Sequence, residues 1–432
     1  MAIPDDLIFK IAKIQDTPFY CYDAQIIRQR YIELREKLNH RAYIFYSAKA
    51  NPNIEVLKEF RKLRAGIAVT SLTELRLAKK AGQSSKDIIF VGPSKSGQEI
   101  REIILNEIQL VIVESIEEIR KINEIASSVG RIQDIALRIN PAFKLEGDGY
   151  KMSGLPTQFG IEEAQLDRAF LALKDLHALR FRGLHVYLGN RVLDYTHLLR
   201  AYSKILLLSD VIRNRFGVTI DILDVGGGFG IPVHPGQADL DIASLLDGLN
   251  RQLSREFYNH PNLKVFFELG RYLVGPAGVF VTGARYVKEC HGKIFAVCDG
   301  GANVHSSAAG YGNPHRENWP VRKVGQQSAL SKVTVTGPLC TPLDTLAVDV
   351  QLPALHASDL VRIDQSGAYG PTHSPVYFVS HGFPAELLID NGTVTLTREP
   401  DKPDDIINKF VTRPIIFNEA EIIENEDVEI AV

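Results

Sequence analysis

The sequence predicts an α/β protein in which a (β/α)8 barrel is followed by a mostly antiparallel β domain. Eight short apolar runs between residues 42 and 268 end in polar or glycine-rich residues, and most precede a segment of helical periodicity. Strands alternating with helices form parallel sheets, and eight such units fit a barrel of roughly 250 residues. From about residue 276 the runs become shorter and rich in Val, Thr, Gly and Pro, which is typical of antiparallel strands joined by turns.

The individual elements follow from this pattern. The predicted barrel strands are Ala42–Ala48, Ala65–Ser71, Asp87–Gly92, Gln109–Glu114, Asp134–Asn140, Arg180–Leu188, Ile220–Val225 and Lys264–Glu268. Helical periodicity marks Ile54–Phe60 and Leu72–Ala81, the second ended by Gly82. We place the barrel at residues 26–275. Residues 1–25 join 276–432 in the β domain, since Phe19–Asp23 has the pattern of a strand. The acidic run Glu421–Glu429 predicts a solvated or frayed end.

Composition narrows the class of protein. With 432 residues, 45% hydrophobic and 23% charged, the chain has the make-up of a soluble two-domain protein. A net charge of −3 provides no basic field for nucleic acid or a membrane surface. The N-terminus lacks a secretory pattern and no stretch of about 20 apolar residues occurs, so a cytoplasmic location is expected. The four cysteines have no metal-binding spacing, so neither zinc, another metal nor disulfides are expected.

Lys49 is the first candidate for chemistry. It follows the apolar run Ala42–Tyr46, which places it at the mouth of the first barrel strand, where catalytic residues of such barrels lie. A lysine there becomes a Schiff-base nucleophile if its surroundings lower its pKa, and this is the chemistry of pyridoxal phosphate. On this segment alone, an ordinary surface lysine is equally compatible.

Two further strand ends complement this lysine. Gly226, Gly227 and Gly228 follow the seventh strand, and backbone without Cβ atoms can turn its N–H groups onto a phosphate. The cluster matches no nucleotide-binding motif. A tight turn of the barrel explains the glycines as well as a phosphate site does. Glu268 ends the eighth strand, and a carboxylate against a pyridine nitrogen makes the ring an electron sink. The alternative is a local ion pair with Arg271.

Together these residues supply an amine, a phosphate cradle and a pyridinium partner, and at this point the chain resembles the fold-type III pyridoxal-phosphate decarboxylases. This family includes the diaminopimelate, ornithine and arginine decarboxylases. The resemblance runs from about Pro18 to about Pro384. Its ordered motifs are Thr17–Tyr20, Tyr46–Asn51, Gly183–His185, the GGGFG segment Gly226–Gly230, Glu268–Arg271, Gly337–Cys340 and Gly367–Gly370.

The resemblance implies an alanine racemase-like barrel, pyridoxal 5′-phosphate as cofactor and a homodimer with shared active sites. Lys49 of one subunit would carry the Schiff base and face Cys340 of the other, which would return a proton to the α-carbon after CO2 leaves. Tyr369 would contact the phosphate. Gly270 and Arg271 would also bind the cofactor.

Several positions depart from the family pattern. Tyr187 and Asn190 stand where the family has a stacking histidine and a serine; a tyrosine still offers an aromatic face, and an asparagine still bonds a phosphate. Ala68 stands near the position of a usual aspartate. His305, His315 and Arg316 lie in a long polar stretch; a lone histidine there is more often solvated than functional, and we assign none of them to the site.

The segment Cys340–Asp344 bears on the substrate. Family members acting on basic amino acids or diaminopimelate place an acidic residue directly after the cysteine, where this chain has Thr341, and their distal-carboxylate arginine has no counterpart in Asp299–Ser307. We therefore expect a substrate with a neutral distal end. The CTPLD pattern is similar to that of biosynthetic-cluster decarboxylases. These include the exosortase-associated group and the butirosin-pathway enzyme that acts on glutamate linked to an acyl-carrier protein.

Other functions stay open at this point. One alternative is a diaminopimelate, lysine or ornithine decarboxylase acting on the free amino acid. A racemase on the same barrel is expected to avoid a carboxylate at the pyridine nitrogen, which Glu268 provides. A non-catalytic binding protein of the same fold is disfavoured, because Lys49, the glycine cluster, Glu268 and Cys340 are retained together.

Overall fold

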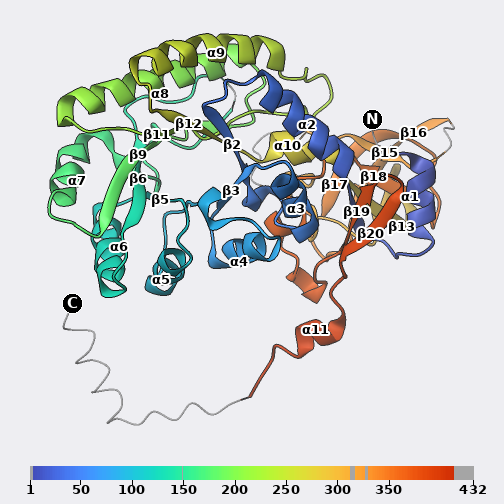
Figure 1. Ribbon diagram of the computed structural model, residues 1–432. Coiled ribbons are helices and arrows are strands. Elements are labelled where there is room, and N and C mark those ends of the chain that lie inside the picture. Colours follow the sequence, from blue (N-terminus) through green and yellow to red (C-terminus); the bar gives the residue numbers. More distant parts are fainter. Residues whose placement is uncertain (1–2, 148, 312–316, 326–328, 413–432) are drawn as a thin grey trace.

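A closed parallel barrel forms the first part of the molecule (Figure 1). The computed structural model describes residues 3–147, 149–311, 317–325 and 329–412. The barrel strands pair in the order β5-β4-β3-β2-β12-β11-β9-β6, and pairing of β5 with β6 closes the ring. Their bounds are β2 (Ala42–Ser47), β3 (Gly66–Val69), β4 (Ile88–Phe90), β5 (Leu110–Val113), β6 (Gln133–Asn140), β9 (Leu179–His185), β11 (Ile222–Asp224) and β12 (Lys264–Leu269). Each overlaps one predicted run, and the predicted fold class is confirmed.

The barrel is filled with side chains because its strands are apolar on both faces. Phe45, Ala68, Ile89, Ile112 and Phe266, with neighbours on the same strands, form one buried cluster separate from the main core. These residues belong to different barrel strands, so the cluster occupies the barrel interior. The main core packs the opposite strand faces against the helices. A closed interior leaves the strand ends as the place for a site.

Most of the helices lie around the barrel, and several begin at side-chain caps, whereas α1 packs against the second sheet. Their bounds are α1 (Asp5–Ala12), α2 (Ala24–Lys37), α3 (Ile54–Lys62), α4 (Leu72–Lys80), α5 (Gly97–Leu105), α6 (Ile116–Ser128), α7 (Leu166–Leu173), α8 (Tyr195–Phe216), α9 (Ile242–Asn259), α10 (Arg271–Val274) and α11 (Pro403–Ile407). Ser71, Ser96 and Ser115 each accept a backbone N–H in the first turn of α4, α5 and α6. Gly82 has a φ of +85°, which suits the chain reversal after α4.

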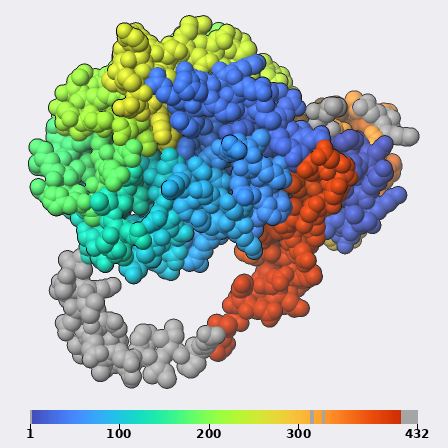
Figure 2. All heavy atoms as spheres, viewed as in Figure 1, coloured from blue at the N-terminus to red at the C-terminus, as the bar shows by residue number. Residues whose placement is uncertain are grey.

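A second, mostly antiparallel sheet lies beside the barrel. Its strands are β1 (Phe19–Asp23), β13 (Gly278–Cys290), β14 (Lys293–Cys298), β15 (Val321–Lys323), β16 (Leu330–Thr336), β17 (Thr345–Pro353), β18 (Leu360–Ile363), β19 (Ala385–Asp390) and β20 (Thr393–Arg398). The main order is β17-β16-β14-β13-β1-β19-β20, and β18 pairs with β13 and β15. Strand β1 lies between β13 and β19, so the N-terminal segment and the red C-terminal segment meet, as Figure 2 shows.

Short elements complete the description: β7 (Tyr150–Lys151) pairs with β10 (Gly189–Asn190), and β8 (Ile161–Glu162) pairs in parallel with the end of β6. Among the described residues, no helix combines the length and apolar composition that a membrane span requires. His315, Arg316 and the predicted frayed end at Glu421–Glu429 lie outside the described residues.

Candidate active site

A cavity of about 320 Å³ lies at the C-terminal ends of the barrel strands. It is walled by strand ends of the barrel and by the segment around residues 369–373 of the β domain. Most of the residues predicted from the sequence line it together: Lys49, Tyr187, Asn190, Gly228, Glu268, Gly270, Arg271 and Tyr369. Residues from four barrel strand ends and from the second domain therefore converge on one space.

Lys49 enters this space from a short 3-10 turn, Ala48–Ala50, directly after β2. Its Nζ lies 5.7 Å from the centre of the Tyr187 ring. The β domain holds the turn in place, because the Tyr369 N–H donates to the Ala50 carbonyl at 2.8 Å and the Asn51 Nδ2 donates to the Gly367 carbonyl at 3.1 Å. The position of the amine thus depends on contact between the two domains.

The charge environment of Lys49 differs from the one expected from the sequence. Burial works to lower the pKa of Lys49, but Tyr369, Tyr187 and the Glu268 carboxylate outweigh it and raise the pKa above its ordinary value. The condition of a lowered pKa, under which this lysine was a candidate nucleophile, is therefore not met in the protein without its cofactor. The physical reason is that Tyr369, Tyr187 and the Glu268 carboxylate lie near the amine inside the cavity.

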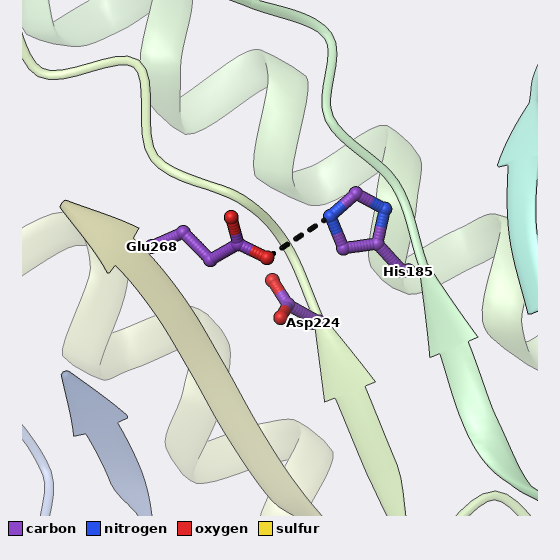
Figure 3. Close-up of side chains that lie close together, drawn as sticks. All are labelled: His185, Asp224 and Glu268. Atoms are coloured by element: carbon purple, nitrogen blue, oxygen red, sulfur yellow. Dashed lines mark ion pairs between the residues drawn. The ribbon is translucent and has the colours of Figure 1, made fainter. Parts of the chain in front are cut away.

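Glu268 is one of three polar side chains that meet at neighbouring strand ends. Figure 3 shows Glu268 on β12, Asp224 on β11 and His185 on β9 pointing toward one another. Glu268 Oε1 lies 3.2 Å from His185 Nε2. Asp224 Oδ1 accepts the Gly226 N–H at 2.8 Å. Oε1 of Glu268, Oδ2 of Asp224 and both ring nitrogens of His185 are buried and make no hydrogen bond of good geometry with the described residues.

One proton is held within this cluster. Burial and the charge of Glu268 raise the pKa of Asp224 well above its ordinary value. Burial acts in the same direction on Glu268, but its contacts with His185, Lys49 and Asp224 lower the Glu268 pKa overall. Burial lowers the pKa of His185. These directions favour a negative charge on Glu268 rather than on Asp224, beside a neutral imidazole.

The glycine cluster supports the cavity from behind as well as lining it. A Cβ on Gly226 would lie 2.4 Å from Tyr187 Cδ2, and one on Gly227 would lie 2.2 Å from the Glu268 carbonyl oxygen. Only Gly228 of the three lines the cavity. Gly226 and Gly227 instead let the Tyr187 ring and the Glu268 strand approach the turn closely, and Gly226 and Gly228 have φ values of +65° and +103°.

Arg271 and Tyr369 form the opposite wall. The Arg271 guanidinium carbon lies 4.6 Å from the centre of the Tyr369 ring, and the buried Nη1 of Arg271 makes no hydrogen bond with the described residues. Burial and the charge of Arg191 lower the pKa of Arg271 to about 10. The alternative interpretation of Glu268, a local ion pair with Arg271, is not what the structure shows: Glu268 turns toward His185 and Asp224, while Arg271 turns toward Tyr369.

Cys340 is the one predicted catalytic residue that does not line this cavity. It is exposed in the loop between β16 and β17. The buried carboxylate of Asp344 braces that loop by accepting the Ala302 and Leu339 N–H groups, each at 2.6 Å. Within one chain the thiol thus faces outward from the β domain, and the Asp344 carboxylate is engaged in holding its loop.

Several residues of the site were not predicted from the sequence. Asp224 and His185 meet Glu268 and do not line the cavity themselves. Asp224 ends a strand just before the glycine cluster, and His185 is two residues before Tyr187 and so lies on the same side of an extended chain; both signals were available. Tyr150, Arg191 and His373 line the cavity, but their loops carry no periodicity that would place them there.

The expectation that His305 is solvated is wrong. His305 is fully buried and packs against Tyr20 and Trp319. Its Nδ1 accepts the Ala308 N–H, so Nε2 carries the proton and donates to Ser366 Oγ at 2.9 Å. Burial lowers the pKa of His305 to about 3, which fits a neutral, structural histidine.

Comparison with known proteins identifies the family. Residues 24–275 match the family model described as pyridoxal-dependent decarboxylase, pyridoxal binding domain. The chain belongs to the pyridoxal-dependent decarboxylases. It is 37% identical over 407 residues to an L-glutamyl-[BtrI acyl-carrier protein] decarboxylase of Niallia circulans, covering 93% of this chain and 95% of that protein. It is also 30% identical to the diaminopimelate decarboxylase of Aquifex aeolicus, covering 92% of each.

A solved structure shares the whole architecture. The diaminopimelate decarboxylase of Helicobacter pylori, complexed with L-lysine, superimposes with a TM-score of 0.84 at 27% identity, covering 93% of this chain and 98% of that one. The chain is accordingly a lyase that uses pyridoxal phosphate, in agreement with the expectation from its motifs.

The cavity residues fit this cofactor. Lys49 offers an amine inside the cavity, Glu268 an ionised carboxylate oxygen without a good hydrogen-bond partner, and Arg271 a buried N–H without an acceptor. These are the groups that an aldehyde, a pyridine nitrogen and a phosphate require. The absence of Cβ atoms at the glycine turn leaves its backbone accessible for close approach.

Proposed function

We propose that this decarboxylase removes the α-carboxylate of an amino acid whose distal end is neutral, and that glutamate joined through its side-chain carboxyl to a carrier-protein thioester is the leading case. The observation that supports this most is the lack of an available acid. Among the described residues lining the cavity, Glu268 is the only carboxylate, and it faces His185 and Asp224. Asp344, the acid of the CTPLD segment, already accepts hydrogen bonds from the Ala302 and Leu339 N–H groups.

A distal ammonium group would find no partner here. Moving it from water into such a site costs a few kcal/mol unless a charge receives it. A thioester carries no such cost. The likeness to a glutamyl-carrier-protein decarboxylase over nearly the full chain supports the same substrate class.

In this proposal each residue has a defined task. Lys49 would hold the cofactor covalently, and Glu268 would keep a proton on its pyridine nitrogen, with Asp224 and His185 orienting Glu268. Tyr187 would cover one face of the ring, Asn190 and Tyr369 would bond the phosphate, and Gly226–Gly228, Gly270 and Arg271 would complete its site. The chemistry that bound pyridoxal phosphate would supply is an electron sink for the α-carbon.

The proton that replaces CO2 comes from Cys340 of a second subunit. Its exposed position in the single chain and its absence from the cavity wall support a shared site in a homodimer. The Cys340 thiol donates its proton to the α-carbon and afterwards recovers one from solvent, so the reaction balances as one amine product and one CO2.

The substrate is tested by measuring CO2 release from a matched panel. Glutamyl thioesters of a carrier protein and of free pantetheine are compared with free glutamate, lysine, ornithine and meso-diaminopimelate. We expect the charged free amino acids to be slower by roughly 10²-fold or more in kcat/KM. If free diaminopimelate, lysine or ornithine instead exceeds about 10⁴ M⁻¹s⁻¹ while thioesters do not react, the alternative of a free amino-acid decarboxylase is correct.

A further inference from the structure

The cavity wall contains more positive charge than the predicted site residues account for. Arg191 lines the same cavity as Arg271. Arg191 is the charged neighbour that most affects Arg271, and the tyrosines Tyr369, Tyr187 and Tyr150 come next; no carboxylate is among them. Among the described residues, neither guanidinium forms an ion pair with an acidic side chain, whereas other arginines of the barrel, such as Arg138 and Arg213, do.

Two unneutralised guanidinium groups in one partly buried cavity repel each other. The repulsion is visible in the pKa of Arg271, which burial and the Arg191 charge lower to about 10. Burial, followed by the charges of Arg271 and Arg191, also lowers the pKa of His373, so this imidazole is neutral at neutral pH. An anion that enters the cavity would relieve this repulsion.

Arg191 is fixed in place at the glycine turn. Its φ of +62° is left-handed, a conformation that costs free energy in a residue with a side chain. The next residue holds this geometry, because the Val192 N–H donates to the Gly228 carbonyl at 3.0 Å and the Gly230 N–H donates to the Val192 carbonyl at 2.8 Å. Arg191 is therefore tied to the turn that lines the cavity.

The guanidinium is also supported from outside. Its carbon lies 4.5 Å from the centre of the Tyr150 ring, and Nη1 lies 3.5 Å from the Tyr150 hydroxyl. Tyr150 is itself positioned by the β7–β10 pairing, in which it lies opposite Asn190. An arginine stacked on an aromatic ring loses little further freedom when it binds an anion.

We propose that Arg191 is a second phosphate-binding arginine, which closes with Arg271 on the phosphate of the cofactor. The inference rests on pyridoxal phosphate as cofactor and is independent of the substrate. A phosphate monoester carries close to two negative charges at neutral pH. One guanidinium leaves part of that charge unpaired in the cavity, whereas two neutralise it and both can donate hydrogen bonds to it.

The test compares pyridoxal phosphate with pyridoxal, which lacks the phosphate. Cofactor-free protein is titrated with each compound, and binding is followed by the visible absorption of the bound chromophore. In Arg191→Gln we expect the Kd for pyridoxal phosphate to rise roughly 10- to 100-fold, with the Kd for pyridoxal changed less than about threefold. Arg191→Lys keeps the charge and should fall between. Arg255→Gln, on the exposed face of α9, is the matched control and should leave both constants unchanged.

A second readout needs neither the chromophore nor activity. Inorganic phosphate should raise the Tm of the cofactor-free wild-type protein and of Arg255→Gln, and should raise it much less in Arg191→Gln. Equal weakening of pyridoxal and pyridoxal phosphate, or an unchanged phosphate effect on Tm, would overturn the assignment. So would an unchanged pyridoxal phosphate Kd combined with a raised KM for carboxylate-bearing substrates, since Arg191 would then bind the substrate. The substrate panel is measured with holoenzyme in a separate experiment, so the substrate proposal and the Arg191 proposal can fail independently.

Discussion

At the scale of single residues, the site depends on where one proton is held. Glu268, Asp224 and His185 come from three neighbouring strands, and two carboxyl groups in contact cannot both ionise without a large cost. The raised pKa of Asp224 favours keeping the negative charge on Glu268, the carboxylate proposed to face the pyridine nitrogen. His185 is neutral and serves as a polar neighbour of Glu268.

This proton distribution predicts a pH dependence of stability. Above about pH 5 both carboxyls are ionised in the unfolded chain, whereas the folded pair keeps one proton because the pKa of Asp224 is raised. The folded protein binds the extra proton, so this contribution to stability falls as pH rises, by about 1.4 kcal/mol per pH unit, until Asp224 ionises. In Asp224→Asn the amide supplies hydrogens without titrating.

Urea unfolding of the cofactor-free proteins between pH 7 and 8.5 measures this difference. The wild type should lose stability relative to Asp224→Asn as pH rises through that window. His185 does not interfere, because it is neutral in the folded and unfolded chains there. Parallel pH profiles for the two proteins would show that Asp224 is ionised in the folded state.

At the scale of elements, the glycine turn after β11 fixes the position of the Tyr187 ring. Gly226 combines two requirements, a left-handed φ of +65° and room for Tyr187, whose Cδ2 would lie 2.4 Å from an added Cβ. The Tyr187 ring in turn lies beside Lys49. Displacing that ring should disturb cofactor binding more than backbone strain alone.

Gly226→Ala is therefore expected to weaken pyridoxal phosphate binding and to destabilise the protein by roughly 1–3 kcal/mol. Gly236→Ala is the control, since Gly236 also has a positive φ, of +82°, but an added Cβ there meets nothing within 4 Å. Both Kd and urea unfolding are measured for each variant. Equal effects of the two substitutions would assign the loss to backbone strain and remove Tyr187 from the explanation.

The elements also show what a sequence can predict. Each of the eight barrel strands was located because near-continuous apolar runs such as Leu110–Val113 are typical of parallel strands buried on both faces. Lys49 and Glu268 followed, since residues at strand ends must face one edge of a barrel. Arg191 and His373 could not be placed, because their loops take positions set by long-range contacts. Helix α1 was also missed, being a short N-terminal segment without a core-facing repeat long enough to detect.

At the scale of the whole molecule, the site joins parts of the chain that are far apart. The β domain holds the Lys49 turn through Tyr369 and Gly367, while Cys340 of the same domain points elsewhere. A homodimer that brings the partner's thiol to each cavity is the arrangement that uses both observations.

Shared sites predict complementation between inactive variants. Lys49→Ala and Cys340→Ala should each be nearly inactive, and mixing them under conditions of subunit exchange should restore part of the wild-type activity, because heterodimers contain one intact site. CO2 release is measured before and after exchange, and exchange itself is followed with differently tagged subunits. If tagged heterodimers form without regained activity, Lys49 and Cys340 act from the same chain.

The central claim is that Lys49 is the residue on which the cofactor is carried. Holoenzyme is reduced with borohydride, digested, and the modified lysine is located by mass spectrometry, with Lys49→Ala treated in parallel. We expect one pyridoxyl adduct, on Lys49, and none in the variant. An adduct on a different lysine in the wild type, or full labelling of Lys49→Ala, would contradict the assignment of the site.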